Sequence, residues 1–165
     1  MKFAIFLTCL AATALALPAP SNSNNGTSGG SNNGSNGAIT ASIIPDFGVT
    51  AGIQSADQSG SCVGVDNKNI PCECPPSKEA FAQTLSTFVS RGVAGASAIE
   101  FSTNFTDQSA VTNLARVNAM INTLQNFNFD KTGRTGDGCP AVSAPNLGTI
   151  RTQLLNGQNV QIGGK

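Results

Sequence analysis

The chain has 165 residues, with nine basic and nine acidic side chains, so its formal net charge is zero. A chain this neutral has no electrostatic footprint for nucleic acid or an anionic membrane, and we expect it to bind neither. It contains no histidine, which excludes Ser-His-Asp and Cys-His catalytic arrangements, and it also has no tryptophan or tyrosine.

The N-terminal segment has the pattern of a signal peptide. Met1-Lys2 is followed by the uncharged apolar run FAIFLTCLAATALA, which is too short to span a bilayer comfortably and ends in a small-x-small triplet. We expect residues 1–16 to be cleaved after Ala16. Because no second long apolar run follows, we expect a secreted, extracellular protein without a membrane span. Cleavage would remove Lys2 and Cys9, leaving eight basic and nine acidic residues and a net charge of −1.

Residues 17–37 form a low-complexity Asn/Gly/Ser tract with almost no apolar side chains, which predicts a disordered tether. This tether contains two candidate N-glycosylation sites, Asn25-Gly-Thr and Asn33-Gly-Ser, and a third lies at Asn104-Phe-Thr. For each site in the tether, an unmodified spacer is an equally open alternative. The folded domain is expected to span residues 38–157.

The first part of this domain is apolar but irregular. Pro45, Gly48 and Gly52 prevent a long regular element. We therefore expect an irregular segment packed across the domain, with a short strand near residues 47–50 as an option. Its apolar side chains are Ile39, Ile43, Ile44, Phe47, Val49 and Ile53. Residues 55–69 are rich in Gly, Ser, Asp and Asn and are predicted to be loop.

Ser77 is suited to cap the first helix, which is predicted to end at Gly92. Its apolar stripe is Ala80, Phe81, Leu85, Phe88 and Val89. A longer helix is predicted over residues 108–127, capped by Thr106 or Asp107. Its expected buried stripe is Val111, Leu114, Val117, Ile121 and Leu124, with Thr112, Arg116, Asn122 and Asn126 facing away.

A last helix is predicted to open at Pro145 and run to about Leu155, with Leu147, Ile150 and Leu154 facing inward and Gly157 ending it. Residues 158–165 are expected to form a flexible tail. The predicted fold class is mainly α: a small disulfide-stapled bundle of about three helices with long irregular loops.

The four cysteines beyond the signal peptide are Cys62, Cys72, Cys74 and Cys139, and an oxidising compartment would join them in two disulfides. Cys72 and Cys74 are too close to bridge each other without strain. Two pairings stay open, namely Cys62–Cys72 with Cys74–Cys139 and Cys62–Cys74 with Cys72–Cys139, and we favour the first. A zinc site is the alternative, but the spacing lacks paired Cys-x2-Cys knuckles.

No stretch of the sequence carries a recognisable catalytic or metal-binding motif. Residues 130–137 resemble a calcium loop, yet Arg134 and Ala141 stand where oxygen ligands belong. A glycosidase-like carboxylate pair is formally open among Glu100, Asp107, Asp130 and Asp137, but the chain has no Trp or Tyr to stack on a sugar. We therefore expect no enzyme, no cofactor and no metal.

With its signal peptide, its tether, and the stretches IIPDFGVTAG, IPCECPP and GDGCP, the chain resembles the small secreted cysteine-containing proteins of filamentous fungi. The resemblance covers most of residues 38–157. It implies a candidate effector or elicitor perceived by a host plant, or a protein of the cell wall or surface. We therefore expect a non-enzymatic glycoprotein whose partner is a host or cell-surface protein. The alternative is an extracellular module that binds a lipid or another apolar small ligand.

Overall fold

Three helices of more than two turns form most of the regular structure in the computed structural model, which describes residues 37–56 and 60–163. They are α1 (Lys78–Arg91), α2 (Ala110–Gln125) and α4 (Pro145–Leu155), and a single turn, α3 (Phe129–Thr132), follows α2. Two disulfides cross-link the domain, which confirms the expected mainly helical, disulfide-stapled class. The expected signal peptide and the tether as far as residue 36, including Asn25 and Asn33, lie outside the described residues.

The remaining elements are short. Three 3₁₀ turns are η1 (Ala41–Ile43), η2 (Val65–Asn67) and η3 (Ala141–Ser143). Two antiparallel hairpins pair β1 (Cys62–Val63) with β2 (Asn69–Ile70) and β3 (Val93–Ala94) with β4 (Ser97–Ala98). The β1–β2 hairpin lies almost entirely within residues 55–69, which were predicted to be loop, and ends one residue beyond them at Ile70. Strands of two residues are too short to show the alternation of apolar and polar side chains that a sequence can display.

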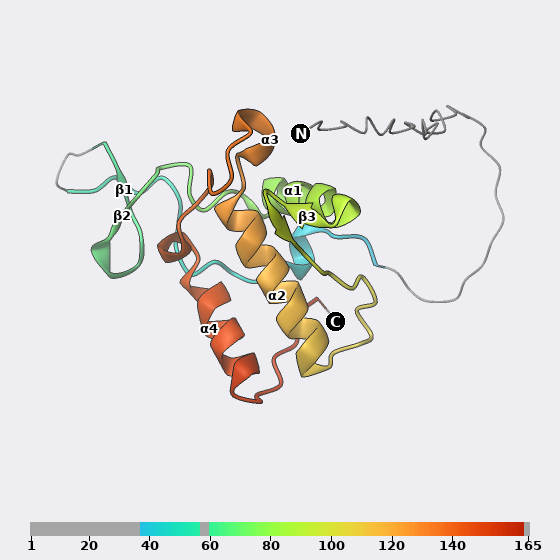
Figure 1. The fold of residues 1–165 in the computed structure, drawn as a ribbon. Coiled ribbons are helices and arrows are strands. Elements are labelled where there is room, and N and C mark those ends of the chain that lie inside the picture. The colour runs from blue at the N-terminus through green and yellow to red at the C-terminus, as the bar shows by residue number, and fades with distance from the viewer. Residues whose placement is uncertain (1–36, 57–59, 164–165) are drawn as a thin grey trace, which may run out of the picture. The chain divides into compact units, whose positions relative to one another are not determined.

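Helices α2 and α4 lie side by side and run in opposite directions (Figure 1). Hydrogen bonds at both ends fix this arrangement. Near the end of α2, the Leu124 carbonyl accepts from the amide of Cys139, before α4 begins. Near the start of α2, Asn113 donates from its side chain to the carbonyl of Val160, after α4 has ended.

The core lies where α1 and α2 meet, and it is filled by large side chains. Phe81, Leu85 and Phe88 of α1 are fully buried, as the helical spacing predicted. The Ser77 hydroxyl accepts from the Ala80 amide, and Gly92 ends the helix in a left-handed conformation, so both predicted caps are confirmed. In α4, Leu147 and Leu154 are buried and Ile150 is partly buried, also as predicted.

The irregular N-terminal segment packs across this core. Ile44 and Phe47 are buried, and the ring of Phe47 meets Phe81 edge-on at 5.3 Å. No strand forms at residues 47–50, because the Asp46 side chain accepts from the Gly48 amide and Gly48 has a positive φ of 84°. Ile53, expected to pack inward, is about half exposed.

The sequence predicted the position of α2 well but its orientation less well. The helix begins at Ala110, and its N-cap is Ser109 rather than Thr106 or Asp107. Val111, predicted to be buried, is 79% exposed. Arg116 and Asn126, predicted to face away from the core, are both buried. Val117 and Leu124 are buried as expected, so the buried face was predicted about one residue position away from where it lies.

The C-terminal segment packs against the domain as far as the structure describes it. Ile162 is only 1% exposed. Its amide donates to the side-chain oxygen of Gln108, and its carbonyl accepts from the side-chain nitrogen of the same residue. The expectation of a flexible tail after residue 157 is therefore wrong for residues 158–163, because an apolar side chain and a paired glutamine anchor them.

Candidate functional site

The two disulfides join the pairs favoured from the sequence. Cys62 is bonded to Cys72, within the β1–β2 hairpin, with their Cα atoms 4.8 Å apart. Cys74 is bonded to Cys139 across 65 residues, with a Cα–Cα distance of 5.5 Å. The second bridge ties the residues just before α1 to the loop after α2. Gly138 permits this, because a side chain there would collide with the backbone of α2 at Leu124.

The third predicted glycosylation site, Asn104, lies in the loop before α2 and is partly buried. Its side-chain oxygen accepts from the hydroxyl of Thr106 at 2.6 Å and from the Thr106 amide at 3.3 Å. Its backbone carbonyl accepts from Arg116 at 2.6 Å. The loop that carries this sequon is therefore held in one conformation from both sides.

Arg116 organises that loop from inside the protein. Its guanidinium donates to the carbonyls of Ser102, Asn104 and Asp107 and to the side chain of Asn113, at 2.6–2.9 Å. The guanidinium carbon also lies 5.1 Å from the centre of the Phe105 ring. Burial lowers the pKa of Arg116, and the nearby carboxylate of Asp107 partly offsets that effect. An arginine nevertheless stays protonated, so four neutral oxygens solvate a buried cation.

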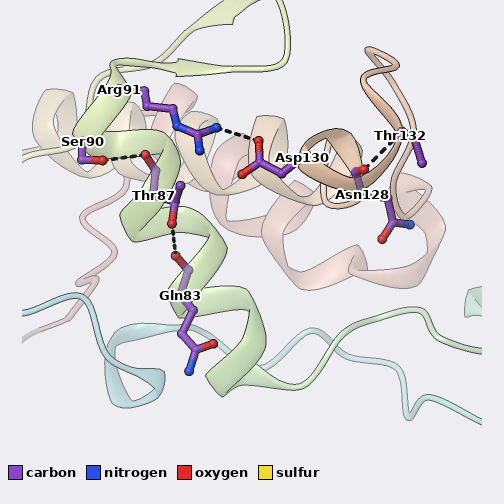
Figure 2. Close-up of polar contacts among 7 residues, drawn as sticks. All are labelled: Gln83, Thr87, Ser90, Arg91, Asn128, Asp130 and Thr132. Carbon is purple, nitrogen blue, oxygen red and sulfur yellow. Dashed lines mark hydrogen bonds and ion pairs between the residues drawn. The ribbon is translucent and has the colours of Figure 1, made fainter.

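The carboxylates considered for catalysis have different surroundings. The Asp107 carboxylate accepts from the hydroxyl of Thr112 and the amide of Ser109. These bonds, with a smaller contribution from Arg116, lower the pKa of Asp107. Figure 2 shows Arg91 reaching from the end of α1 to Asp130 of α3, an exposed ion pair of 2.6 Å. Both aspartates thus have structural partners.

A concave surface lies between α2, α4 and β4. Its larger hollow has a volume of about 680 Å³ and is lined by Ala98, Asn118, Ile121, Asn122, Gly148, Arg151 and Thr152. An adjoining hollow of about 220 Å³ shares Ala98, Asn118 and Asn122, and adds Ile99, Glu100, Ala115 and Ala119. We call the two hollows together the α2–α4 groove.

Side chains from two helices meet in this groove. The Arg151 Nε atom donates to Asn118 Oδ1 at 2.9 Å, linking α4 to α2. Asn122 lies one turn further along the same face of α2 as Asn118. Among the described residues, Arg151 is the only charged one that lines the larger hollow, and Glu100 is the only charged one that lines the smaller hollow. The groove is therefore polar, with opposite charges on its two sides.

No sequence pattern singled out this groove. Asn118 and Arg151 were not among the candidate residues, and Asn122 was predicted only to face away from the core. The sole local signal is the pair of asparagines at i and i+4, a spacing that places both on one face of a helix. Their meeting with Arg151 depends on the packing of α4 on α2, which local sequence patterns do not encode.

Three further findings bear on function. Within residues 37–56 and 60–163, no cluster of three or more His, Cys, Asp or Glu side chains could hold a metal ion. No helix in this part of the chain is long and apolar enough to cross a membrane. Comparison with protein-family models, curated proteins and solved structures finds no match to the chain.

Proposed function

We propose that this protein is a secreted, non-enzymatic fungal protein that acts by surface recognition, as an effector or elicitor in contact with a plant. The observation that carries the proposal is the contrast between a filled core and a polar surface groove. Phe81, Leu85 and Phe88 occupy the interior, whereas the α2–α4 groove opens at the surface. Such a molecule presents its binding groups on its outside.

This contrast favours surface recognition over the binding of a lipid or another apolar ligand. An apolar ligand needs a cavity lined mainly by hydrophobic side chains. The groove instead presents two asparagines, an arginine and a threonine. Ile121 is the one large apolar side chain among the residues that line its larger hollow.

A non-enzymatic role is supported by the same inventory of side chains. The sequence has no histidine to act as a general base. Cys62, Cys72, Cys74 and Cys139 are all in disulfides and offer no thiolate nucleophile. The disulfides also support a role in an oxidising extracellular compartment.

The test is to infiltrate the purified, oxidised protein into leaf tissue and to follow a tagged copy during infection. We expect localised cell death or an oxidative burst, with the tagged protein reaching the plant apoplast. Protein that has been reduced and alkylated is the matched control, because it has the same composition without the disulfide staples. If leaves did not respond and the tag stayed in the fungal wall, the protein would instead be a wall component.

We also propose that Asn104 carries an N-glycan. Thr106, the residue whose hydroxyl the sequon requires, is exposed and hydrogen bonded to the Asn104 side chain. Treatment of the secreted protein with a peptide N-glycosidase should convert Asn104 to aspartate with loss of a glycan mass. An unmodified tryptic peptide covering this residue would contradict the assignment.

A further inference from the structure

One wall of the α2–α4 groove is an open edge of β structure. Within the β3–β4 hairpin, Val93 is opposite Ala98, and the Ile99 amide donates to the Gly92 carbonyl at 3.0 Å. Bonded and non-bonded residue pairs alternate along an antiparallel ladder. Because Gly92 and Ile99 form a bonded pair, the amide and carbonyl of Ala98 point away from β3. Ala98 is exposed and lines both hollows, so this edge can accept an extended peptide.

The facing wall, on α2, carries two side-chain amides whose spacing is close to that of alternate peptide groups in an extended chain. Asn118 and Asn122 are four residues apart on a helix, which separates them by about 6 Å along its axis. Alternate peptide groups of an extended chain repeat every 6.6 to 6.8 Å or so. A side-chain amide has both a donor and an acceptor, as a peptide group does. Asn118, whose Oδ1 already accepts from Arg151, can donate from its side-chain nitrogen to one peptide group of a chain lying in the groove, and Asn122 can pair with the next alternate peptide group.

Arg151, on the α4 side of the groove, favours a ligand that carries a negative charge. Its Nε atom is held by Asn118, which orients the planar guanidinium, and its two terminal nitrogens have no partner among the described residues. A guanidinium fork with two parallel donors matches the geometry of a carboxylate. Among the residues that the structure describes, no acidic side chain lines the larger hollow, and Glu100 lines only the smaller one.

We propose that the α2–α4 groove binds an extended peptide segment that carries a carboxylate, which pairs with Arg151 while the peptide backbone pairs with Ala98, Asn118 and Asn122. The carboxylate can come from the C terminus of the bound chain or from an Asp or Glu side chain. This inference rests on the proposed recognition function and names the ligand of its groove. A sugar chain fits less well, because no aromatic side chain of residues 37–56 and 60–163 lines either hollow to stack on a sugar ring.

The experiment uses the oxidised full-length protein and two random hexapeptide libraries, one ending in a free carboxylate and one amidated, with uronic-acid oligosaccharides as a third arm. Peptides retained on the immobilised protein are sequenced, and their affinities are measured by fluorescence anisotropy. We expect Arg151→Gln to weaken binding at least about tenfold, the loss of one oriented charge-assisted pair. Arg134→Gln is the matched control, because it makes the same change in an exposed loop that does not line the groove.

A second variant tests the backbone edge. Ala98→Pro removes an amide that points away from β3, so it should weaken peptide binding while the far-ultraviolet circular dichroism spectrum stays that of the wild type. For each selected peptide, amidating the C terminus or changing its acidic side chains to amides identifies the source of the carboxylate. After one of these changes, the peptide should bind the wild type and Arg151→Gln with equal affinity.

Three results would overturn the inference: equal binding by wild type and Arg151→Gln, retention of uronic-acid oligosaccharides in place of peptides, or no retained peptide. Leaf assays separate this failure from failure of the proposed function. A leaf response that is the same for wild type and Arg151→Gln, with no peptide bound, refutes only the groove ligand. Peptide binding that depends on Arg151, without any leaf response, refutes only the effector role.

Discussion

Among substitutions that leave every apolar side chain unchanged, we expect replacement of Arg116 to destabilise the domain most. It is fully buried, and three of its four hydrogen bonds join the body of α2 to the loop before it, while the fourth is to Asn113 within α2. Replacing it with methionine keeps a long side chain of similar reach but leaves the oxygens of Ser102, Asn104 and Asp107 without their donor.

The expected size of the effect follows from two opposing terms. Hydrogen bonds to a charged group contribute about 1.5–3 kcal/mol each, but burying the cation cancels much of their sum. Arg116→Met removes the only charge and leaves three loop carbonyls without their donor, each costing about 1–3 kcal/mol where it stays buried and dry. Because the desolvation cost of the cation is relieved at the same time, we expect a net loss of about 3–5 kcal/mol. Arg116→Lys keeps the charge but lacks the planar guanidinium fork. We expect it to lower the free energy of unfolding by about half as much as Arg116→Met does.

The assay is urea denaturation of the oxidised protein, followed by far-ultraviolet circular dichroism. Small domains have about 5–15 kcal/mol of stability, so Arg116→Met could approach unfolding. Arg116→Lys then keeps the comparison measurable, and Arg134→Met provides a control at an exposed arginine. If Arg116→Met changed the free energy of unfolding by less than about 0.5 kcal/mol, the guanidinium network would contribute no net stability, as is known for some buried ion pairs.

Three other changes test parts of the structure independently. Replacing Cys74 and Cys139 with alanine opens a 65-residue loop and should lower the free energy of unfolding by about 4 kcal/mol in the chain-entropy model; an unchanged urea midpoint would contradict this. The folded-state pKa of Asp107 is lowered, so its stabilising contribution is present above its unfolded pKa and is lost as the pH falls through the folded value. In Asp107→Asn, the free energy of unfolding should therefore fall less steeply as the pH is lowered. The same pH dependence in the variant and the wild type would refute this role. Ile162→Ala should cost about 2–5 kcal/mol because the side chain is buried, whereas a truly frayed tail would tolerate it in a thermal melt.

The two ends of α1 were predictable because their signals are local. Ser77 and Gly92 each act on backbone groups within one turn of helix, so their roles follow from residue type and spacing alone. The pairing of the cysteines was narrowed by the same kind of reasoning, since two cysteines separated by one residue rarely bridge each other. The structure then selects one of the two remaining pairings.

The C-terminal segment was mispredicted because its anchor is not local. Its sequence, GQNVQIGGK, is polar and glycine-rich, which is typical of a mobile end. Burial of Ile162 depends on Gln108, 54 residues earlier, whose side chain pairs with both backbone groups of Ile162. No periodicity near either residue indicates that they meet.

Helix α2 shows most clearly where sequence reasoning reached its limit. A polar residue on an amphipathic helix is ordinarily predicted to face solvent. Arg116 and Asn118 are two residues apart, and nothing in their local sequence tells them apart. Arg116 is buried because the loop of residues 102–107 supplies backbone carbonyls that solvate its charge, whereas Asn118 is only partly buried and meets Arg151 in the groove. A polar residue on such a helix can therefore be assigned to the interior or to a binding surface only once the oxygens around it are known.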